Sequence, residues 1–108
     1  MARQVNLGEL EHVTLLAILR IRDGAYGVPI REEIRKCTDR SVSAGALYTI
    51  LTRLEEKGLV SSSFGDPTPE RGGRPKRFYK VTAPGIRAVK STQRNLQNLM
   101  RGLRLSEL

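Results

Sequence analysis

Residues 43–82 restrict the fold of this chain more than any other segment. Their first part carries apolar residues at the i, i+3, i+4, i+7 spacing of one helix face, which we expect to lie in the core. These residues are Leu47, Ile50, Leu51 and Leu54. Ser43 stands before them as an N-cap, and Gly58 follows Lys57 as a residue that can take the left-handed conformation at a helix end. The pattern therefore predicts a short capped helix with a sharp stop.

Two short runs rich in β-forming residues follow, at 59–64 and 76–81. The segment between them, 65–75, contains three prolines and three glycines, which cannot continue either strand. Residues 70–80 contain five cations and one anion. Their local charge of +4 is half of the net charge of +8. We therefore expect a hairpin with an extended cationic tip, which suits the narrow, electronegative minor groove of DNA.

The side of the predicted helix away from its leucines carries small, hydroxylic and cationic residues. Such groups can approach a major groove closely and donate to phosphates or base edges. Tyr48 lies on the flank of the apolar stripe, so it can equally be a half-buried packing residue. A leucine stripe and a basic loop each occur in many folds. A capped helix, a glycine stop and a cation-tipped hairpin in this order are much more specific, and they predict a winged DNA-binding element.

A helix is predicted before this segment, over residues 7–22. Its apolar residues recur at helical spacing, and it ends at Asp23-Gly24. Leu15, Leu16 and Leu19 widen its apolar surface, so we expect this helix to be largely buried.

A second helix is predicted to begin near Pro29, which fits a first helical turn, and to end near Cys37. Ile30 and Ile34 should face inward. The link 38–42 is short and polar, so this helix and the next should pack at an angle, as in a helix-turn-helix. The residues that this turn would place near the DNA backbone are Arg40 and Ser41.

The last helix is predicted to begin after Thr82 as its cap, with Pro84 tolerated in its first turn. Its apolar residues alternate at spacings of three and four, a heptad seam with one polar break at Gln93. Such a helix has little left to cover in its own domain, and a chain of 108 residues gains from further burial. We therefore expect a homodimer, with packing against the first helix of the same chain as the alternative. The residues expected in the dimer interface are Leu7, Leu10, Val89, Leu96, Leu99, Met100 and Leu103.

Three motifs allow a comparison with a known family: Tyr26-Gly27, then SAGALY at 43–48 with LEEKGLV at 54–60, then GRPKRFYKVT at 73–82. In these the chain resembles PadR-family transcriptional regulators of the short kind, with a single C-terminal helix. The resemblance implies a mainly α fold with a small β-hairpin, in which a winged helix-turn-helix at 1–82 and a dimerisation helix at 83–108 form one compact unit.

The resemblance also implies a function, that of a homodimeric bacterial repressor that reads a palindromic operator with the third helix and the wing. Members of the family often sense a small molecule, so an effector is expected without its identity. Because this chain has no tryptophan, members that hold drugs between a tryptophan pair are not a model for that effector. The predicted DNA contacts, of which Arg74 is the foremost, are Arg40, Ser41, Ser43, Gly45, Tyr48, Thr49, Arg53, Arg71, Gly73, Arg74, Lys76 and Arg77.

The composition of the chain indicates which partners it binds and argues against several classes of protein. The net charge of +8 favours a polyanion such as double-stranded DNA, and the few scattered aromatic residues do not form a base-stacking platform for RNA. One cysteine and one histidine, Cys37 and His12, are too few for a disulfide or a zinc site. No nucleophile–base pair or phosphate-binding glycine loop is present, so we expect neither an enzyme nor a cofactor. No apolar run is long enough to cross a membrane, and a cytoplasmic protein is expected.

Two alternatives to a sequence-specific regulator stay open. A protein that coats nucleic acid without sequence preference needs only the basic surface, and an adaptor could use the winged fold to bind another protein.

Overall fold

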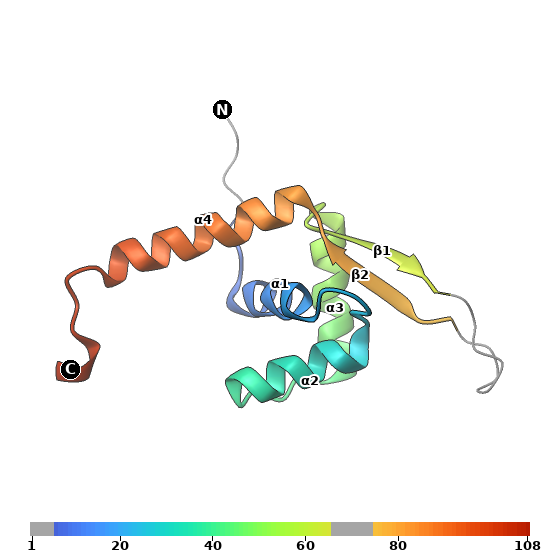
Figure 1. The fold of residues 1–108 in the computed structure, drawn as a ribbon, viewed down its shortest axis with the longest axis horizontal. Helices are drawn as coiled ribbons and strands as arrows, with labels where there is room; N and C mark the ends of the chain where they lie inside the picture. The colour runs from blue at the N-terminus through green and yellow to red at the C-terminus, as the bar shows by residue number, and fades with distance from the viewer. Residues whose placement is uncertain (1–5, 66–74) are drawn as a thin grey trace.

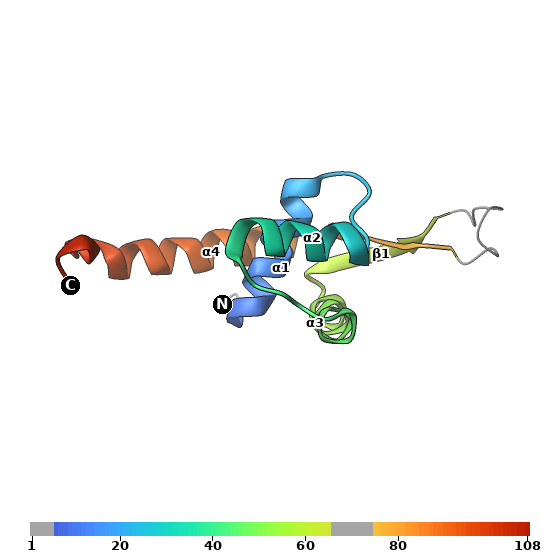
Figure 2. The same cartoon turned by 90° about the horizontal axis from the view of Figure 1, so that it is seen from below.

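The structure, a computed structural model, describes residues 6–65 and 75–108. Its elements are α1 (Glu9–Ile21), α2 (Gly27–Thr38), α3 (Ala44–Glu56), β1 (Val60–Phe64), β2 (Arg77–Val81), α4 (Ala83–Met100) and the short 3-10 helix η2 (Leu105–Glu107). The expected fold class, mainly helical with a small antiparallel hairpin, is confirmed. Helices α1 to α3 form the body, and the hairpin and α4 extend from it in opposite directions (Figures 1 and 2).

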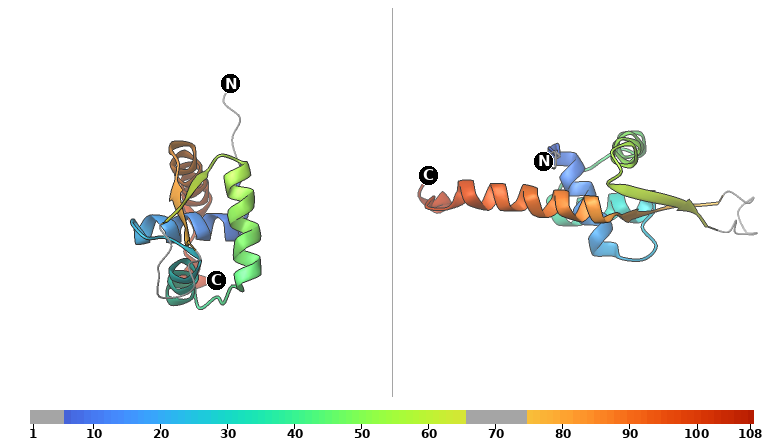
Figure 3. Two further views of the ribbon diagram at one scale, coloured as in Figure 1. Left: turned by 90° about the vertical axis from the view of Figure 1, so that its right-hand side faces the viewer. Right: turned by 90° about the horizontal axis from the view of Figure 1, so that it is seen from above.

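The core lies where α1, α2 and α3 converge, and its centre consists of fully buried aliphatic side chains. These include Leu15, Ile30, Ile34, Leu47, Leu54 and Leu59. The apolar stripe predicted for the third helix and the two inward isoleucines of the second are therefore confirmed. Burying each such side chain stabilises the fold by about 1.5–3 kcal/mol relative to exposure. This core fixes the direction of α3, which crosses the body at a steep angle to α1 (Figure 3, left).

The ends of α3 form as the sequence predicts. The Ser43 side chain accepts a hydrogen bond from the Ala46 N–H at 3.1 Å, which caps the helix. Gly58 takes a positive φ of 75°, and the Leu59 N–H then donates to the Leu54 carbonyl at 2.9 Å. Because a residue with a Cβ is strained at this φ, the glycine sets the sharp turn from α3 into the hairpin.

Helix α2 begins at Gly27, two residues earlier than predicted. Pro29 is consequently the third helical residue and still lies in the first turn, as predicted. A proline is tolerated there because the first N–H groups of a helix have no carbonyl partner within the helix. Tyr26 stands at the N-cap position in extended conformation and gives no side-chain cap.

Helix α1 is less buried than predicted. Leu15 is fully buried, but Leu16 and Leu19 are 38% and 37% exposed. The helix also begins at Glu9, so Leu7 precedes it and packs against the core from the loop. The prediction was wrong for Leu16 and Leu19 because periodicity marks an apolar face without showing whether this chain covers all of it.

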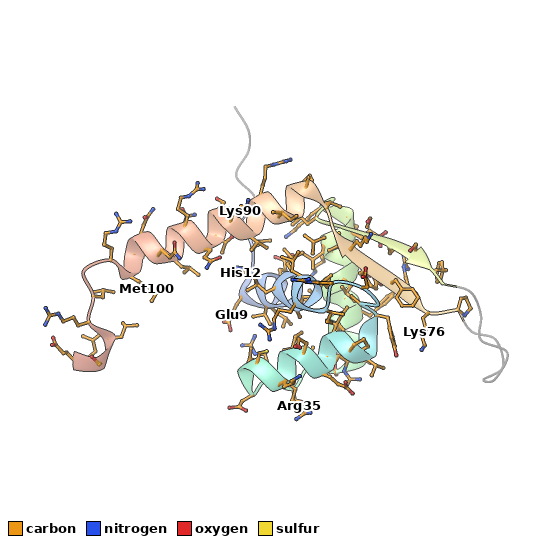
Figure 4. All side chains as sticks on the ribbon, viewed as in Figure 1. Glu9, His12, Arg35, Lys76, Lys90 and Met100 are labelled. Atoms are coloured by element: carbon orange, nitrogen blue, oxygen red, sulfur yellow. The ribbon has the colours of Figure 1, made fainter. Side chains whose placement is uncertain are left out.

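Helix α1 carries one buried ionisable side chain, Glu11, and one half-buried one, His12. Glu11 accepts hydrogen bonds from Lys57 Nζ at 2.7 Å and from the Gly8 N–H at 2.8 Å. Burial alone raises the pKa of Glu11, but these bonds and the charges of Lys57 and Arg53 outweigh it and hold the pKa below its usual 4.5. Burial lowers the pKa of His12 below 6.5, and its Nε2 has no hydrogen-bond partner among the described residues. His12 lies between α1 and α4 (Figure 4).

The hairpin is antiparallel, with Val60 opposite Val81 and Phe64 opposite Arg77. Each strand starts one residue later than predicted. Leu59, expected in the first strand, lies instead in the turn after α3, where its carbonyl accepts from the Thr82 N–H at 3.0 Å. The hairpin is joined to the body because the Tyr79 N–H, on β2, donates to the carbonyl of residue 25 in the α1–α2 loop at 2.8 Å.

The first turn of α4 packs closely on the turn after α3. Thr82 caps α4 by accepting from the Gly85 N–H at 3.2 Å, as predicted, and its hydroxyl donates to the Gly58 carbonyl at 2.7 Å. Gly85 is buried, and a Cβ there would collide with the Leu59 carbonyl oxygen. The glycine is therefore required for this close approach.

Beyond its first turns, α4 projects away from the body (Figure 1). Val89, predicted in the dimer seam, is buried in the core of its own chain. The helix ends at Met100, and Gly102 adopts a φ of 84°, so Leu103 lies past the helix and does not continue a helical seam. Leu96, Leu99 and Met100 are exposed in the single chain.

Candidate nucleic-acid interface

The outer face of α3 is free of packing. Tyr48 is 59% exposed, so it is a surface residue and not part of the core. Ser43, Gly45, Thr49 and Arg53, predicted on the same side, are also exposed. A Cβ at Gly45 would meet no atom within 4 Å, so nothing inside this chain requires glycine there. The absence of a side chain instead leaves the backbone of α3 open to a ligand.

Two hydroxyl groups on this face donate to the helix itself. Thr49 Oγ1 donates to the Gly45 carbonyl at 3.1 Å, and Thr52 Oγ1 donates to the Tyr48 carbonyl at 2.9 Å. Because each hydroxyl hydrogen is used within the helix, a ligand can meet these threonines at their acceptor oxygens or their methyl groups. These are suited to base edges, such as an exocyclic amine or a thymine methyl, more than to phosphates.

The turn between α2 and α3 brings Arg40 and Ser41 to the surface beside the start of α3. Asp39 takes the left-handed conformation that ends α2, with φ at 56°. Arg40 forms an exposed ion pair with Glu9 of α1 at 2.9 Å. Arg31 Nε donates to the Val42 carbonyl at 2.8 Å and so fastens the turn to α2. An incoming phosphate could compete with Glu9 for Arg40, because an exposed ion pair contributes only about 0–1 kcal/mol.

Arg77 of β2 is held against α3. Its Nε donates to Ser62 Oγ at 3.0 Å, and its NH2 group donates to Glu55 Oε1 at 3.1 Å. Ser62 Oγ in turn donates to Glu55 Oε2 at 2.7 Å. Because Arg77 already has a carboxylate partner, the structure gives it a part in orienting the hairpin relative to α3.

Lys76 precedes β2 and lies near the N-terminal end of α2 (Figure 4). Its Nζ donates to the Tyr26 hydroxyl at 3.3 Å and lies 4.5 Å from the centre of the Tyr26 ring. The other predicted residues of the wing, Arg71, Gly73 and Arg74, lie outside the described residues.

A hollow of about 280 Å³ lies between the start of α2, α3 and β2. Its apolar floor includes Leu47, Leu51 and Tyr79, and Tyr26, Arg31 and Lys76 stand among its polar residues. Burial raises the pKa of the Tyr79 phenol, although the charge of Arg77 lowers it in part, so Tyr79 is neutral at physiological pH. The surface of α3 and the surface of β2 are therefore continuous across this hollow.

Two lining residues, Tyr26 and Arg31, were not predicted as site residues. In the sequence, Tyr26 stands out only as part of a family motif. Arg31 carries a positive charge in the N-terminal half of α2, toward the positive end of the helix dipole, and this unfavourable placement was the signal available in the sequence.

The described residues hold no group of three or more histidine, cysteine, aspartate or glutamate side chains that could bind a metal ion. Cys37 is exposed and free. In 6–65 and 75–108, no helix is long and apolar enough to cross a membrane.

The three-helix body, the hairpin and the exposed face of α3 define the class of winged helix-turn-helix DNA-binding proteins. The model of the PadR-like family of transcriptional regulators matches residues 15–91, and the chain belongs to that family. Proteins of this family are transcriptional regulators and not enzymes.

Individual relatives agree with this membership. An uncharacterised protein of Lysinibacillus sphaericus is 31% identical over 80 residues, which cover 72% of this chain and 69% of that protein. The structure of a PadR-like transcription factor from Bacteroides fragilis has a TM-score of 0.66 and 27% identity, with 83% of this chain and 82% of that chain covered. A transcriptional regulator from Clostridium thermocellum shares the fold with a TM-score of 0.69 at 24% identity, over 85% of this chain and 86% of that chain.

Proposed function

We propose that the chain is a homodimeric repressor that binds a palindromic operator. The observation that carries this proposal is the exposed face of α3, where Gly45 leaves the backbone accessible beside Tyr48 and Thr49. A helix of this kind can enter a major groove, and two such helices in a dimer can reach half-sites about 34 Å apart. Occupation of the operator would then block transcription by occlusion.

The wing is proposed to contact the flanking minor groove. Arg71, Gly73 and Arg74, which the structure does not describe, belong to its cationic tip. Replacement of Arg74 by alanine should weaken specific binding by about 1–3 kcal/mol if this side chain reads the groove. An unchanged binding isotherm would remove Arg74 from the interface.

The dimer is proposed to use the part of α4 that projects from the body. Leu99 is 73% exposed, and Leu96 and Met100 are also exposed, which leaves an apolar stripe without a cover in the single chain. Leu7 and Leu10 are partly buried against their own core and would lie at the edge of this interface. Leu103 would extend it beyond the helix end, whereas Val89 is buried in the core of its own chain and lies outside this interface. We infer that residues 1–82 bind DNA and residues 83–108 bring two copies together.

Analytical ultracentrifugation tests the dimer directly. Leu99→Asp should shift the protein toward the monomer, because a charge would have to be buried in an apolar interface. Asn98→Asp adds the same charge on the face of α4 away from the stripe of Leu96, Leu99 and Met100, and should leave the dimer intact. Equal behaviour of the two variants would show that this stripe is not the interface.

The DNA-binding proposal is tested by selecting duplexes from a random pool with the purified protein at near-physiological salt. Enrichment of an inverted repeat is the expected result, and the spacing of its halves reports the geometry of the dimer. Retained DNA without an enriched motif would instead indicate a coating protein, and no retention would favour an adaptor. Salt dependence gives a second criterion, because neutralising 6–10 phosphates lowers affinity about 10³- to 10⁵-fold between 50 and 200 mM salt.

A further inference from the structure

The hollow between α2, α3 and β2 has an apolar floor and a rim of hydrogen-bond donors. Leu47 and Leu51 of α3 and Tyr79 of β2 are buried beneath it. Tyr26 and Arg31 reach it from the start of α2, and Lys76 reaches it from the residue before β2. The hollow is open to solvent.

The rim of the hollow has hydrogen-bond donors that are left for a ligand. The Lys76 ammonium can only donate, so the Tyr26 oxygen is the acceptor in their 3.3 Å contact. The hydrogen of the Tyr26 hydroxyl is therefore left for another acceptor. Arg31 uses Nε on the Val42 carbonyl, and its two terminal nitrogens lie beyond that bond. A ligand on this rim should be an acceptor.

The charge of the rim is also uncompensated. None of the described residues that line the hollow is an aspartate or a glutamate. No ion pair joins Lys76 or Arg31 to an acid within the part of the chain that the structure describes. Arg77 differs from them, because Glu55 balances its charge. The ligand that fits is an anion with acceptor oxygens and an apolar body beside them.

We propose that this hollow seats one nucleotide of the operator backbone. Its phosphate would accept hydrogen bonds from Tyr26, Lys76 and Arg31, and its deoxyribose would lie on the apolar floor. This inference rests on the proposed function, because it assumes α3 in a major groove and the wing in the adjacent minor groove.

The geometry of DNA supports this position. The major and minor grooves of a duplex are separated by a single backbone strand. If α3 occupies one groove and the hairpin the other, the strand between them must cross the surface that joins α3 to β2. Tyr48 of α3 and Lys76 before β2 both line the hollow on that surface. A phosphate contact there would set the register of α3 on the duplex without reading sequence itself.

Two variants test the donors, with a matched control. Lys76→Ala should reduce the slope of log Kd against log salt concentration by about one for each half-site. Tyr26→Phe removes only the hydroxyl and should weaken binding by about tenfold with an unchanged salt slope, since the phenol is uncharged. The control is Lys80→Ala, because Lys80 is an exposed lysine of β2 that lines a different hollow with Ser61. It should change neither the affinity nor the slope.

The nucleotide is located by replacing single phosphates of the selected duplex with neutral methylphosphonates. In the wild-type protein, one replacement per half-site, on the strand between the two grooves, should weaken binding by about tenfold. The same replacement should weaken Lys76→Ala less than it weakens the wild type, because one of the three donors to that phosphate is already lost. Circular dichroism of each variant confirms that it is folded.

The outcomes separate this inference from the function on which it rests. The nucleotide site in the hollow is refuted if methylphosphonates weaken DNA binding by the wild type and by Lys76→Ala equally at every position. It is also refuted if Lys80→Ala lowers the salt slope as much as Lys76→Ala does. In both cases the proposed binding of an operator stands. If the wild-type protein selects no duplex at all, the proposed function is refuted, and the nucleotide site is refuted with it.

Discussion

Replacement of Gly45 by alanine should separate the stability of α3 from its approach to DNA. Gly45 is the second residue of α3, it is exposed, and its φ is not among the positive values found in the chain. An added Cβ would meet no atom within 4 Å, so the substitution creates no clash in the free protein. What remains is the difference in helix propensity, because glycine loses more backbone entropy on folding than alanine.

The expected stabilisation of the free protein is about 0.5–1 kcal/mol. For a domain of this size, that corresponds to a rise in Tm of about 2–8 °C in thermal denaturation followed by circular dichroism. Ala46→Gly makes the reverse change at the next residue of the same exposed helix, and it should lower Tm by a similar amount. A lower Tm for Gly45→Ala would refute the conclusion that the space around Gly45 is open.

The same variant should bind the operator less tightly. Its methyl group would stand on the face of α3 beside Tyr48 and Thr49, where we propose that base edges approach the backbone. A loss of at least tenfold in affinity, about 1.4 kcal/mol, is expected in a fluorescence anisotropy titration with the selected duplex. A more stable Gly45→Ala protein that binds as tightly as the wild type would show that DNA does not approach α3 at this residue.

Three further substitutions have expected outcomes. Gly85→Ala should destabilise the fold by about 1–3 kcal/mol or more in urea unfolding, because its Cβ would collide with the Leu59 carbonyl; an unchanged midpoint would contradict that packing. The ion pair of Glu11 with Lys57 holds the folded pKa of Glu11 below 4.5, so its stabilisation is complete above pH 4.5 and is lost as the pH falls through the folded value. Glu11→Gln should therefore lower stability at pH 7 and flatten the acid limb of the stability–pH curve, and a parallel curve would be inconsistent with this account. Burial lowers the pKa of His12 in the folded state, so the unfolded chain binds a proton first as the pH falls. The free energy of unfolding should therefore decrease as the pH drops below 6.5. His12→Leu should abolish this decrease, and a decrease that persists in the variant would have to come from other groups.

Helix caps and glycine stops were predicted correctly from the sequence, because each depends on a residue type that favours one local conformation. Ser43 caps α3, Thr82 caps α4, and Gly58 takes the left-handed conformation, all as predicted. Each of these outcomes depends on a hydrogen bond or a backbone angle formed within a few residues. The leucine spacing of α3 was equally informative, because its stripe had to be buried somewhere in any fold.

Predictions that depended on the surroundings of a side chain were less accurate. Leu16 and Leu19 widen the apolar surface of a helix that was expected to be largely buried, but they are exposed, whereas Val89 was expected between two chains and is buried within one. Hydrophobic spacing is the same in both cases. Whether a given apolar face meets the same chain depends on how the helices pack, and that is not encoded in the spacing of one helix.

The sequence by itself determined the elements, their order, the cationic hairpin and the family, because caps, glycine stops and apolar periodicity act over a few residues. Only the tertiary structure decided which side chains meet. It paired Arg77 with Glu55, and it brought Tyr26 within 3.3 Å of Lys76, fifty positions later in the chain. Contacts between distant segments follow from how the core orients α2, α3 and the hairpin, and the hollow that they enclose exists only once that packing is complete.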